Sequence, residues 1–284
     1  MDDISKHKVE LGKALLSIRA ANPMIAVVGD VMLDVWKMGT VSRISQEAPV
    51  QVVRVYETLY SLGGAANAAE NVCTLDAQVQ LIGVVGNDEA ASIIGGQVGR
   101  RGISSSLVVD EMRPTTQKTR VVGDRGYQLL RFDEEERFAV EDATVNDLLK
   151  KLSERLPTSQ AILWSDYGKG VITPQTARGI TEIAAKFGIP IVVDPKPSHA
   201  PLYTGAHTLT PNEEEAREML ERYDSKMEAE RVALGLALQF ESNVIVTCGE
   251  RGAWLADCES HTTRELQTNP IAVSDVTGAG DTFA

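Results

Sequence analysis

DVTGAGD, residues 275–281, is a run of small residues that lies just after the apolar tripeptide IAV. An apolar run before such residues predicts a strand that turns tightly into a helix. Small side chains expose backbone N–H groups at such a turn, and the helix N-terminus adds the positive end of a dipole. Gly278, Ala279 and Gly280 therefore predict an anion site, with Asp281 placed to accept a proton from an attacking hydroxyl. The structural alternative is a glycine-rich turn capped by Asp281.

Strand-like apolar runs alternate with helical stretches along most of the chain. The first run, 25–29, ends in Gly-Asp, as buried parallel strands often do. Further strands are predicted at 79–85, 160–165, 190–194, 206–209 and 243–248, and helices at 3–21, 65–76, 89–101, 174–187, 212–222 and 226–241. This alternation predicts an α/β fold over residues 1–284, a single domain whose mostly parallel sheet is flanked by helices.

Short alternating segments interrupt this pattern at about 31–60 and 105–135. Within the second segment, 116–123 and 126–132 predict two antiparallel strands joined by a turn at 123–126. We expect these segments to form a small β lid at the open edge of the sheet. Ligands of α/β proteins bind there, beyond the carboxyl ends of the strands.

Composition narrows the class of protein. The 284 residues are 43% hydrophobic and 24% charged, as in ordinary globular proteins. The formal net charge of -12 argues against nucleic-acid binding, which needs a positive surface. No apolar run reaches the ~18 residues that a membrane span needs, so we expect no membrane segment. Cys73, Cys248 and Cys258 lack the spacing of a disulfide framework or zinc site, which favours a cytoplasmic protein.

The 275–281 stretch resembles the signature of the ribokinase-like (phosphofructokinase B) carbohydrate kinases, and further motifs match that family in the same order. The resemblance implies that the Gly-Ala-Gly amides form an anion hole, that Asp281 is the catalytic base, and that ATP and Mg²⁺ are used. It also implies that Asp34 accepts a sugar hydroxyl, that Gly63 and Gly64 let the backbone approach the sugar, and that Asn67 hydrogen-bonds it. A loop carboxylate and a turn before a small-residue helix are the structural alternatives.

Asn212 and Glu215 match the family's N-x-x-E motif, which by resemblance holds Mg²⁺ near the ATP phosphates, largely through water. The same two residues have the pattern of a helix capping box, and both roles can hold together. The resemblance further implies a set of nucleotide-binding residues, namely Asp194, Lys196, Asn212, Thr247, Gly249 and Gly252.

Within the family, several stretches are similar to the heptose 7-phosphate kinases, at 29–34, 42–50, 63–67, 165–170 and 193–196. This similarity implies transfer of phosphate from ATP to the anomeric hydroxyl of D-glycero-D-manno-heptose 7-phosphate, in ADP-heptose and lipopolysaccharide core synthesis. A kinase for fructose or ribose is one alternative. A catalytically silent sugar or nucleotide binder is another.

An acidic chain that binds a phosphorylated sugar needs a local cationic pocket. Strand alternation places Lys118 and Arg120 on one face of the lid. Alternation and resemblance together give four substrate-binding candidates, Lys118, Arg120, Arg131 and Lys169. For each of them a solvated surface charge is the alternative.

The resemblance also implies a homodimer formed through paired lids. The chain ends three residues after Asp281, where the family's helix continues and later elements complete the adenine pocket. We therefore expect a kinase domain that is truncated at its C-terminus.

Overall fold

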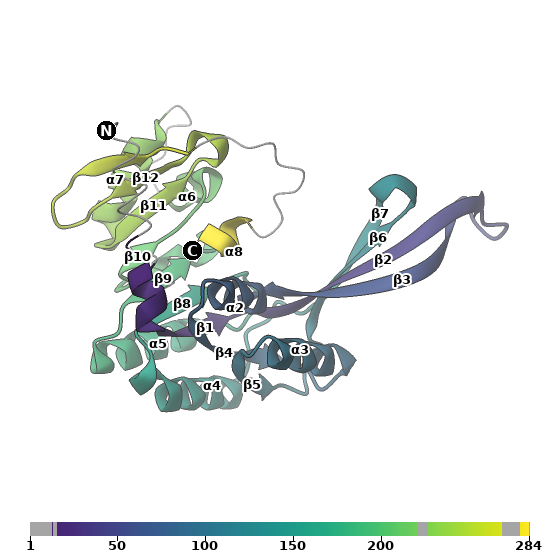
Figure 1. Ribbon diagram of the computed structural model, residues 1–284, viewed down its shortest axis with the longest axis horizontal. Coiled ribbons are helices and arrows are strands. Elements are labelled where there is room, and N and C mark those ends of the chain that lie inside the picture. The colour runs from purple at the N-terminus through teal and green to yellow at the C-terminus, as the bar shows by residue number, and fades with distance from the viewer. Residues whose placement is uncertain (1–12, 14–15, 221–226, 269–278, 284) are drawn as a thin grey trace.

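The computed structural model describes residue 13 and residues 16–220, 227–268 and 279–283 (Figure 1). Within these residues the strands form a nine-stranded sheet of order β13-β12-β11-β10-β9-β8-β1-β4-β5 and a four-stranded sheet of order β3-β2-β6-β7. Figure 1 shows the smaller sheet reaching outward from the larger one as an arm. The predicted lid is therefore a distinct β sheet.

The large sheet is parallel from β5 to β11 and antiparallel at β12 and β13. Its strands are β1 (Met24–Gly29), β4 (Gln78–Val85), β5 (Ser104–Val109), β8 (Ala161–Ser165), β9 (Ile191–Asp194), β10 (Thr208–Leu209), β11 (Asn243–Thr247), β12 (Ala253–Ala256) and β13 (Thr263–Leu266). The sequence did not predict β12 and β13, because each is only four residues long and β13, with the sequence TREL, has no apolar run.

Helices cover both faces of this sheet. They are α2 (Ala65–Thr74), α3 (Glu89–Arg100), α4 (Asp142–Arg155), α5 (Pro174–Phe187), α6 (Glu213–Met219), α7 (Ala229–Phe240) and α8 (Ala279–Phe283). The 3₁₀ turns are η1 (Asp124–Gly126), η2 (Leu156–Thr158), η3 (Pro197–Tyr203) and η4 (Gly249–Arg251). Of the helix predicted at 3–21, residues 16–21 are helical; the others, except residue 13, lie outside the described residues.

Successive residues of the central strands enter two separate apolar cores. Val27 and Leu81 belong to the core under α2 and α3, whereas Val28 and Ile82 belong to the core under α4, α5 and α7. This alternation is what a parallel strand buried on both faces requires. The predicted helix-flanked, mostly parallel sheet is confirmed.

The lid consists of β2 (Val31–Ile44), β3 (Gln51–Gly64), β6 (Thr116–Val122) and β7 (Gln128–Glu134). The second lid segment was predicted to begin near residue 105, but β5 pairs with β4 in the large sheet. Ser104 and Ser105 are exposed because β5 is an edge strand, and this polar start hid its place in the main sheet.

No helix in the described part of the chain is long and apolar enough to cross a membrane. Cys73, Cys248 and Cys258 are all free cysteines, as their spacing predicted.

Candidate functional site

The strand register of the lid gathers charged side chains on one face. Residues that pair directly across a sheet point to the same side. One row across β2, β6 and β7 is Asp34, Lys118 and Asp133, and the next is Trp36, Arg120 and Arg131. We call this the cationic lid face, and it includes three of the four predicted substrate-binding cations.

Two arginines on this face are paired with carboxylates. Arg120 Nη1 donates to Asp34 Oδ1 at 2.5 Å, and both side chains are largely buried. Arg131 donates to both oxygens of Asp133, at 2.9 and 2.7 Å. Arg120 also lies over the Trp36 ring, 4.7 Å from its centroid. The Arg120 guanidinium is therefore fixed in a largely buried position, whereas Arg131, whose side chain is 43% exposed, forms a surface ion pair.

Lys118 lies between these groups. Its pKa is lowered by burial, and the charges of Lys169 and Arg131 lower it further, while Asp34 opposes the shift. The ammonium lies 5.2 Å from the centroid of the Tyr167 ring. The other cations of the site are thus close enough to Lys118 to influence its protonation.

Lys169 reaches this region from the loop between β8 and α5. Its Nζ lies 2.5 Å from Glu135 Oε2, just beyond the end of β7. Burial of Glu135 opposes its ionisation, but hydrogen bonds from Lys169 and Arg137 lower its pKa on balance. The four predicted cations therefore come together at the junction of lid and sheet, interleaved with carboxylates.

The paired glycines allow neighbouring segments of the chain to approach closely. A Cβ on Gly63 would lie 2.7 Å from Asp34 Oδ2, and one on Gly64 would lie 2.3 Å from the Asp30 carbonyl oxygen. Gly64 has a φ of +55°, which favours glycine, and it precedes α2, whose first turn carries Asn67. The chain thus brings the start of α2 against Asp34.

The C-terminal motif lies beside the same helix. Asn71 Nδ2 of α2 donates to Thr282 Oγ1 of α8 at 3.1 Å, and Figure 1 shows α8 next to α2. Ala279 and Gly280 are the first residues of α8, whereas Gly278 lies outside the described residues. Asp281 is described only through its backbone, as the third residue of α8.

The predicted nucleotide residues follow the carboxyl ends of neighbouring strands. Asp194 ends β9, Thr247 ends β11, and Asn212 forms an isolated parallel bridge with Thr247. A Cβ on Gly168 would lie 3.6 Å from Lys196 Cγ. Burial raises the pKa of Glu215, and the charge of Lys196 partly opposes this rise. Lys196 therefore lies between the Lys169 loop and the N-x-x-E motif.

Asn212 and Glu215 form the predicted capping box of α6. Asn212 Oδ1 accepts from the Glu215 amide, and Glu215 Oε2 accepts from the Asn212 amide, each at 2.9 Å. Burial raises the pKa of Glu215 despite this hydrogen bond. The capping role is confirmed, and the amide and carboxylate oxygens can also accept hydrogen bonds from the waters around a hydrated Mg²⁺.

Gly249 and Gly252 shape the turn between β11 and β12. Their φ values are +58° and +85°, and a Cβ on Gly252 would lie 2.1 Å from the Leu266 carbonyl oxygen. The Cys248 amide donates to the Gly252 carbonyl at 2.7 Å. Backbone geometry alone therefore requires glycine at 252.

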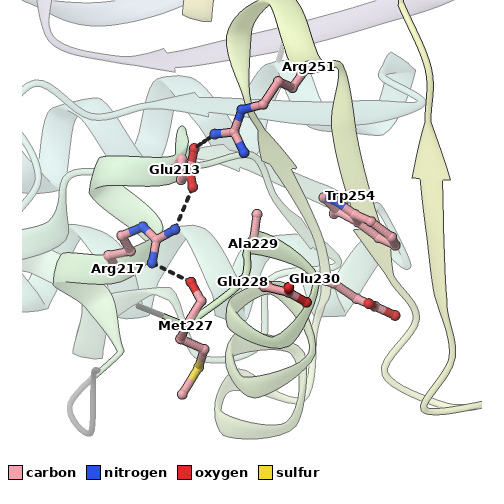
Figure 2. Close-up of a pocket in the computed structure, with 8 residues that line it drawn as sticks. All are labelled: Glu213, Arg217, Met227, Glu228, Ala229, Glu230, Arg251 and Trp254. Carbon is pink, nitrogen blue, oxygen red and sulfur yellow. Dashed lines mark hydrogen bonds and ion pairs between the residues drawn. The ribbon is translucent and has the colours of Figure 1, made fainter. Parts of the chain in front are cut away.

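A pocket of about 450 Å³ opens beside this turn, and the sequence did not predict it. It is lined by Glu213, Arg217, Met227, Glu228, Ala229, Glu230, Arg251 and Trp254 (Figure 2). Figure 2 shows the Glu213 carboxylate between the two arginines, and both form ion pairs with it. The pocket adjoins Asn212 and the 249–252 turn, but none of the predicted nucleotide residues lines it.

The sequence also did not predict a hydrogen-bond network around Asp166 that includes the Lys196 amide. Asp166 Oδ2 accepts from the Tyr203 hydroxyl at 2.8 Å and lies 2.9 Å from His199 Nδ1. The same hydroxyl accepts from the Lys196 amide at 2.7 Å. The available signal was a carboxylate directly after each of two adjacent apolar strands, Asp30 after β1 and Asp166 after β8.

The fold and the cationic lid face define an α/β protein that presents charged groups at the carboxyl edge of a parallel sheet, where such folds bind ligands. The sequence pattern described as "pfkB family carbohydrate kinase" matches residues 22–284, and the chain belongs to this family. The predicted family is confirmed.

Two relatives carry names that bear on substrate. The chain is 42% identical over 274 residues to the D-beta-D-heptose 7-phosphate kinase of Bordetella bronchiseptica. The aligned region covers 93% of this chain and 82% of that protein. It is 38% identical over 268 residues to the Bifunctional protein HldE of Caulobacter vibrioides, covering 93% of this chain and 54% of that protein. The chain thus spans about half the length of this bifunctional relative.

Solved structures confirm the ribokinase-like fold. Phosphofructokinase-2 from Escherichia coli matches with a TM-score of 0.73 at 17% identity, covering 92% of this chain and 84% of that one. The ribokinase of Arabidopsis thaliana, solved with ribose and ATP, matches with a TM-score of 0.67 at 19% identity, covering 92% and 83%.

Proposed function

We propose that this kinase transfers the γ-phosphate of ATP to the anomeric hydroxyl of D-glycero-D-manno-heptose 7-phosphate, forming the 1,7-bisphosphate. The product would serve ADP-heptose and lipopolysaccharide core synthesis. The relatives named for this substrate, at 38% and 42% identity, support the choice of sugar. The free cysteines support a cytoplasmic setting, where thiols stay reduced.

The observation that carries the proposal is the cationic lid face. Lys118, Arg120 and Arg131 gather on this face in a chain of net charge -12. Lys169 reaches the same region from the loop after the carboxyl end of β8, the edge at which such folds bind ligands. Such a cluster attracts a dianionic sugar phosphate, and charge-assisted hydrogen bonds hold it. Asp34 lies next to Gly63, where it can accept a sugar hydroxyl.

In this proposal the residues of the C-terminal motif catalyse the phosphoryl transfer. Asp281 takes the proton from the attacking hydroxyl, while the amides of Gly278, Ala279 and Gly280 stabilise the charge on the transferring phosphoryl group. Asn212 and Glu215 would hold Mg²⁺ through its waters, since their capping hydrogen bonds leave further oxygen lone pairs. Bound Mg²⁺ would neutralise charge on the ATP phosphates.

One observation favours a second candidate, a kinase for an unphosphorylated sugar such as fructose or ribose. Arg120, Arg131 and Lys169 already have carboxylate partners, so the net positive charge of the face is small. A substrate phosphate would have to compete with Asp34, Asp133 and Glu135 for these cations.

The deciding experiment is a coupled ADP-release assay with heptose 7-phosphate, unphosphorylated heptose, fructose 6-phosphate, fructose and ribose. We expect heptose 7-phosphate to give the highest kcat/KM. Equal use of the two heptoses would remove the phosphate pocket from the proposal. Calorimetric binding of sugar or ATP without any ADP release would instead favour a silent binder.

We also propose that the protein forms a homodimer through the lid. Tyr60, Leu130 and Phe132 are 42%, 56% and 40% exposed. Their partners across the sheet are Val35, Val121 and Thr119, which alternate with the residues of the cationic lid face, so these three side chains lie on the opposite face. An exposed apolar sheet face of this kind is typical of an interface. Leu130→Lys should shift the mass in sedimentation equilibrium to that of a monomer. Leu75→Lys, at an exposed position just after α2, should not. A monomeric wild type would refute the dimer.

A further inference from the structure

Lys169 lies in a loop whose backbone has little freedom. Its neighbours Gly168 and Gly170 have φ values of +64° and +85°, so the lysine is held between two left-handed residues. A Cβ on Gly170 would lie 2.0 Å from the Phe138 carbonyl oxygen. The loop is therefore pressed against the segment through which the chain leaves the lid.

Asp30 holds this loop from the side of β1. Its carboxylate accepts from the amides of Tyr167 at 2.8 Å, Lys169 at 3.1 Å and Val171 at 3.4 Å. Asp30 is 1% exposed. Hydrogen bonds to a carboxylate are stronger than those between neutral groups, so three alternate amides are fixed to one buried anion.

Arg113 holds the same loop from the side of the lid. Its Nη1 donates to the Lys169 carbonyl at 2.8 Å, and its Nη2 donates to the Phe138 carbonyl. Arg113 is 8% exposed and lies between β5 and β6, while Phe138 lies between β7 and α4. The chain enters the β6–β7 part of the lid through the first connection and leaves it through the second.

The peptide N–H of Lys169 is thus held by the buried carboxylate of Asp30, and its C=O is held by the buried guanidinium of Arg113. Charged side chains are expensive to bury, and a loop with only a packing role can be held by neutral groups. We propose that Asp30 and Arg113 are positioning residues, which clamp the backbone of Lys169 so that its ammonium reaches the phosphate of the sugar. This inference rests on the proposed function.

The test is a double-mutant cycle in the full chain. Asp30→Asn should raise KM for heptose 7-phosphate about tenfold, the cost of misplacing one charge-assisted hydrogen bond, and leave KM for ATP unchanged. Amides 167–171 should exchange hydrogen faster in this variant. In a Lys169→Ala background, Asp30→Asn should have no further effect on KM for the sugar, because its effect passes through Lys169.

Arg113→Lys gives a second route should Asp30→Asn fold poorly, and it should produce the same split between the two KM values. Glu70→Gln breaks the ion pair between Glu70 of α2 and Arg101 and serves as a control without a KM effect. Equal rises in both KM values, or a full Asp30→Asn effect in the Lys169→Ala background, would overturn the positioning role. Should the wild type reject heptose 7-phosphate, the proposed function fails, and the same cycle is run with the sugar that it accepts.

Discussion

The Lys118 ammonium lies 5.2 Å from the centroid of the Tyr167 ring, which connects β6 of the lid to the loop that carries Lys169. Arg120 and Arg131 on the same face are each bonded to a carboxylate, so their charge is partly neutralised. A lysine over an aromatic face keeps its ammonium N–H donors available for a further partner. Lys118 is therefore the best placed of these cations to make a new contact with a substrate phosphate.

Lys118→Ala should raise KM for heptose 7-phosphate about tenfold to a hundredfold, because a charge-assisted hydrogen bond to phosphate is worth ~1.5–3 kcal/mol. KM for ATP and KM for unphosphorylated heptose should stay the same. Lys150→Ala is the matched control, since Lys150 is an exposed lysine of α4 and not part of the lid. Steady-state kinetics with the two sugars measure these KM values. An equal rise in KM for both sugars would mean that Lys118 does not contact the phosphate.

The features that the sequence predicted are those fixed by local geometry. The two-residue period of a strand put Lys118 and Arg120 on one face before any register was known. The spacing of Asn212 and Glu215 gave the capping box, because both partners lie within one helical turn.

The clamp on Lys169 had no such local signal. Asp30 and Arg113 lie 139 and 56 positions from Lys169 in the chain, and only the parallel order of β1 beside β8 and the return of the lid bring them together. The place of β5 was missed for a related reason. Ser104–Val109 begins with three serines, so it carries no clear signal of a buried strand, although Leu107 and Val108 pack against the two cores of the large sheet.

The capping box and the proposed metal role of Asn212 and Glu215 can be separated. Asn212→Ala combined with Glu215→Ala should lower the free energy of unfolding by about 0.5–2 kcal/mol through the lost cap. Turnover should fall further and need more Mg²⁺, because phosphoryl transfer depends on the metal. Mg²⁺ titrations of activity and urea melts measure the two effects. Thr173→Ala removes the cap of α5 and should affect stability alone; an equal Mg²⁺ dependence in both variants would leave only the cap.

The contact between His199 and Asp166 predicts a pH-dependent stability. The hydrogen bond to Asp166 raises the pKa of His199 above its ordinary value of 6.5, although burial opposes the shift. A group whose pKa rises on folding stabilises the folded state while it is protonated. That contribution is complete below the unfolded pKa and is lost as pH rises through the folded pKa.

The difference in unfolding free energy between wild type and His199→Gln should therefore be largest near about pH 5.5 and shrink toward about pH 8.5. Urea unfolding across this range gives the difference directly. An Asp166→Asn background removes the partner carboxylate, so there the pH dependence should disappear. A difference that stayed constant across the range would show that folding does not shift the pKa of His199.

Asp281→Asn should retain ATP binding and lose turnover by about 10²–10⁴, the usual contribution of a positioned general base. The reason is its place directly after the Gly-Ala-Gly turn, in a helix that the Asn71–Thr282 hydrogen bond ties to α2. The start of α2 also carries Asn67 and follows Gly63, which lies against Asp34, so Asp281 belongs to the helix next to the proposed sugar site. Asparagine has nearly the same shape and still accepts hydrogen bonds, so it preserves a cap but cannot take a proton. Calorimetry with ATP, thermal melting and kcat together separate the roles. Near-full turnover in a variant that melts like wild type would reduce Asp281 to a helix-capping residue.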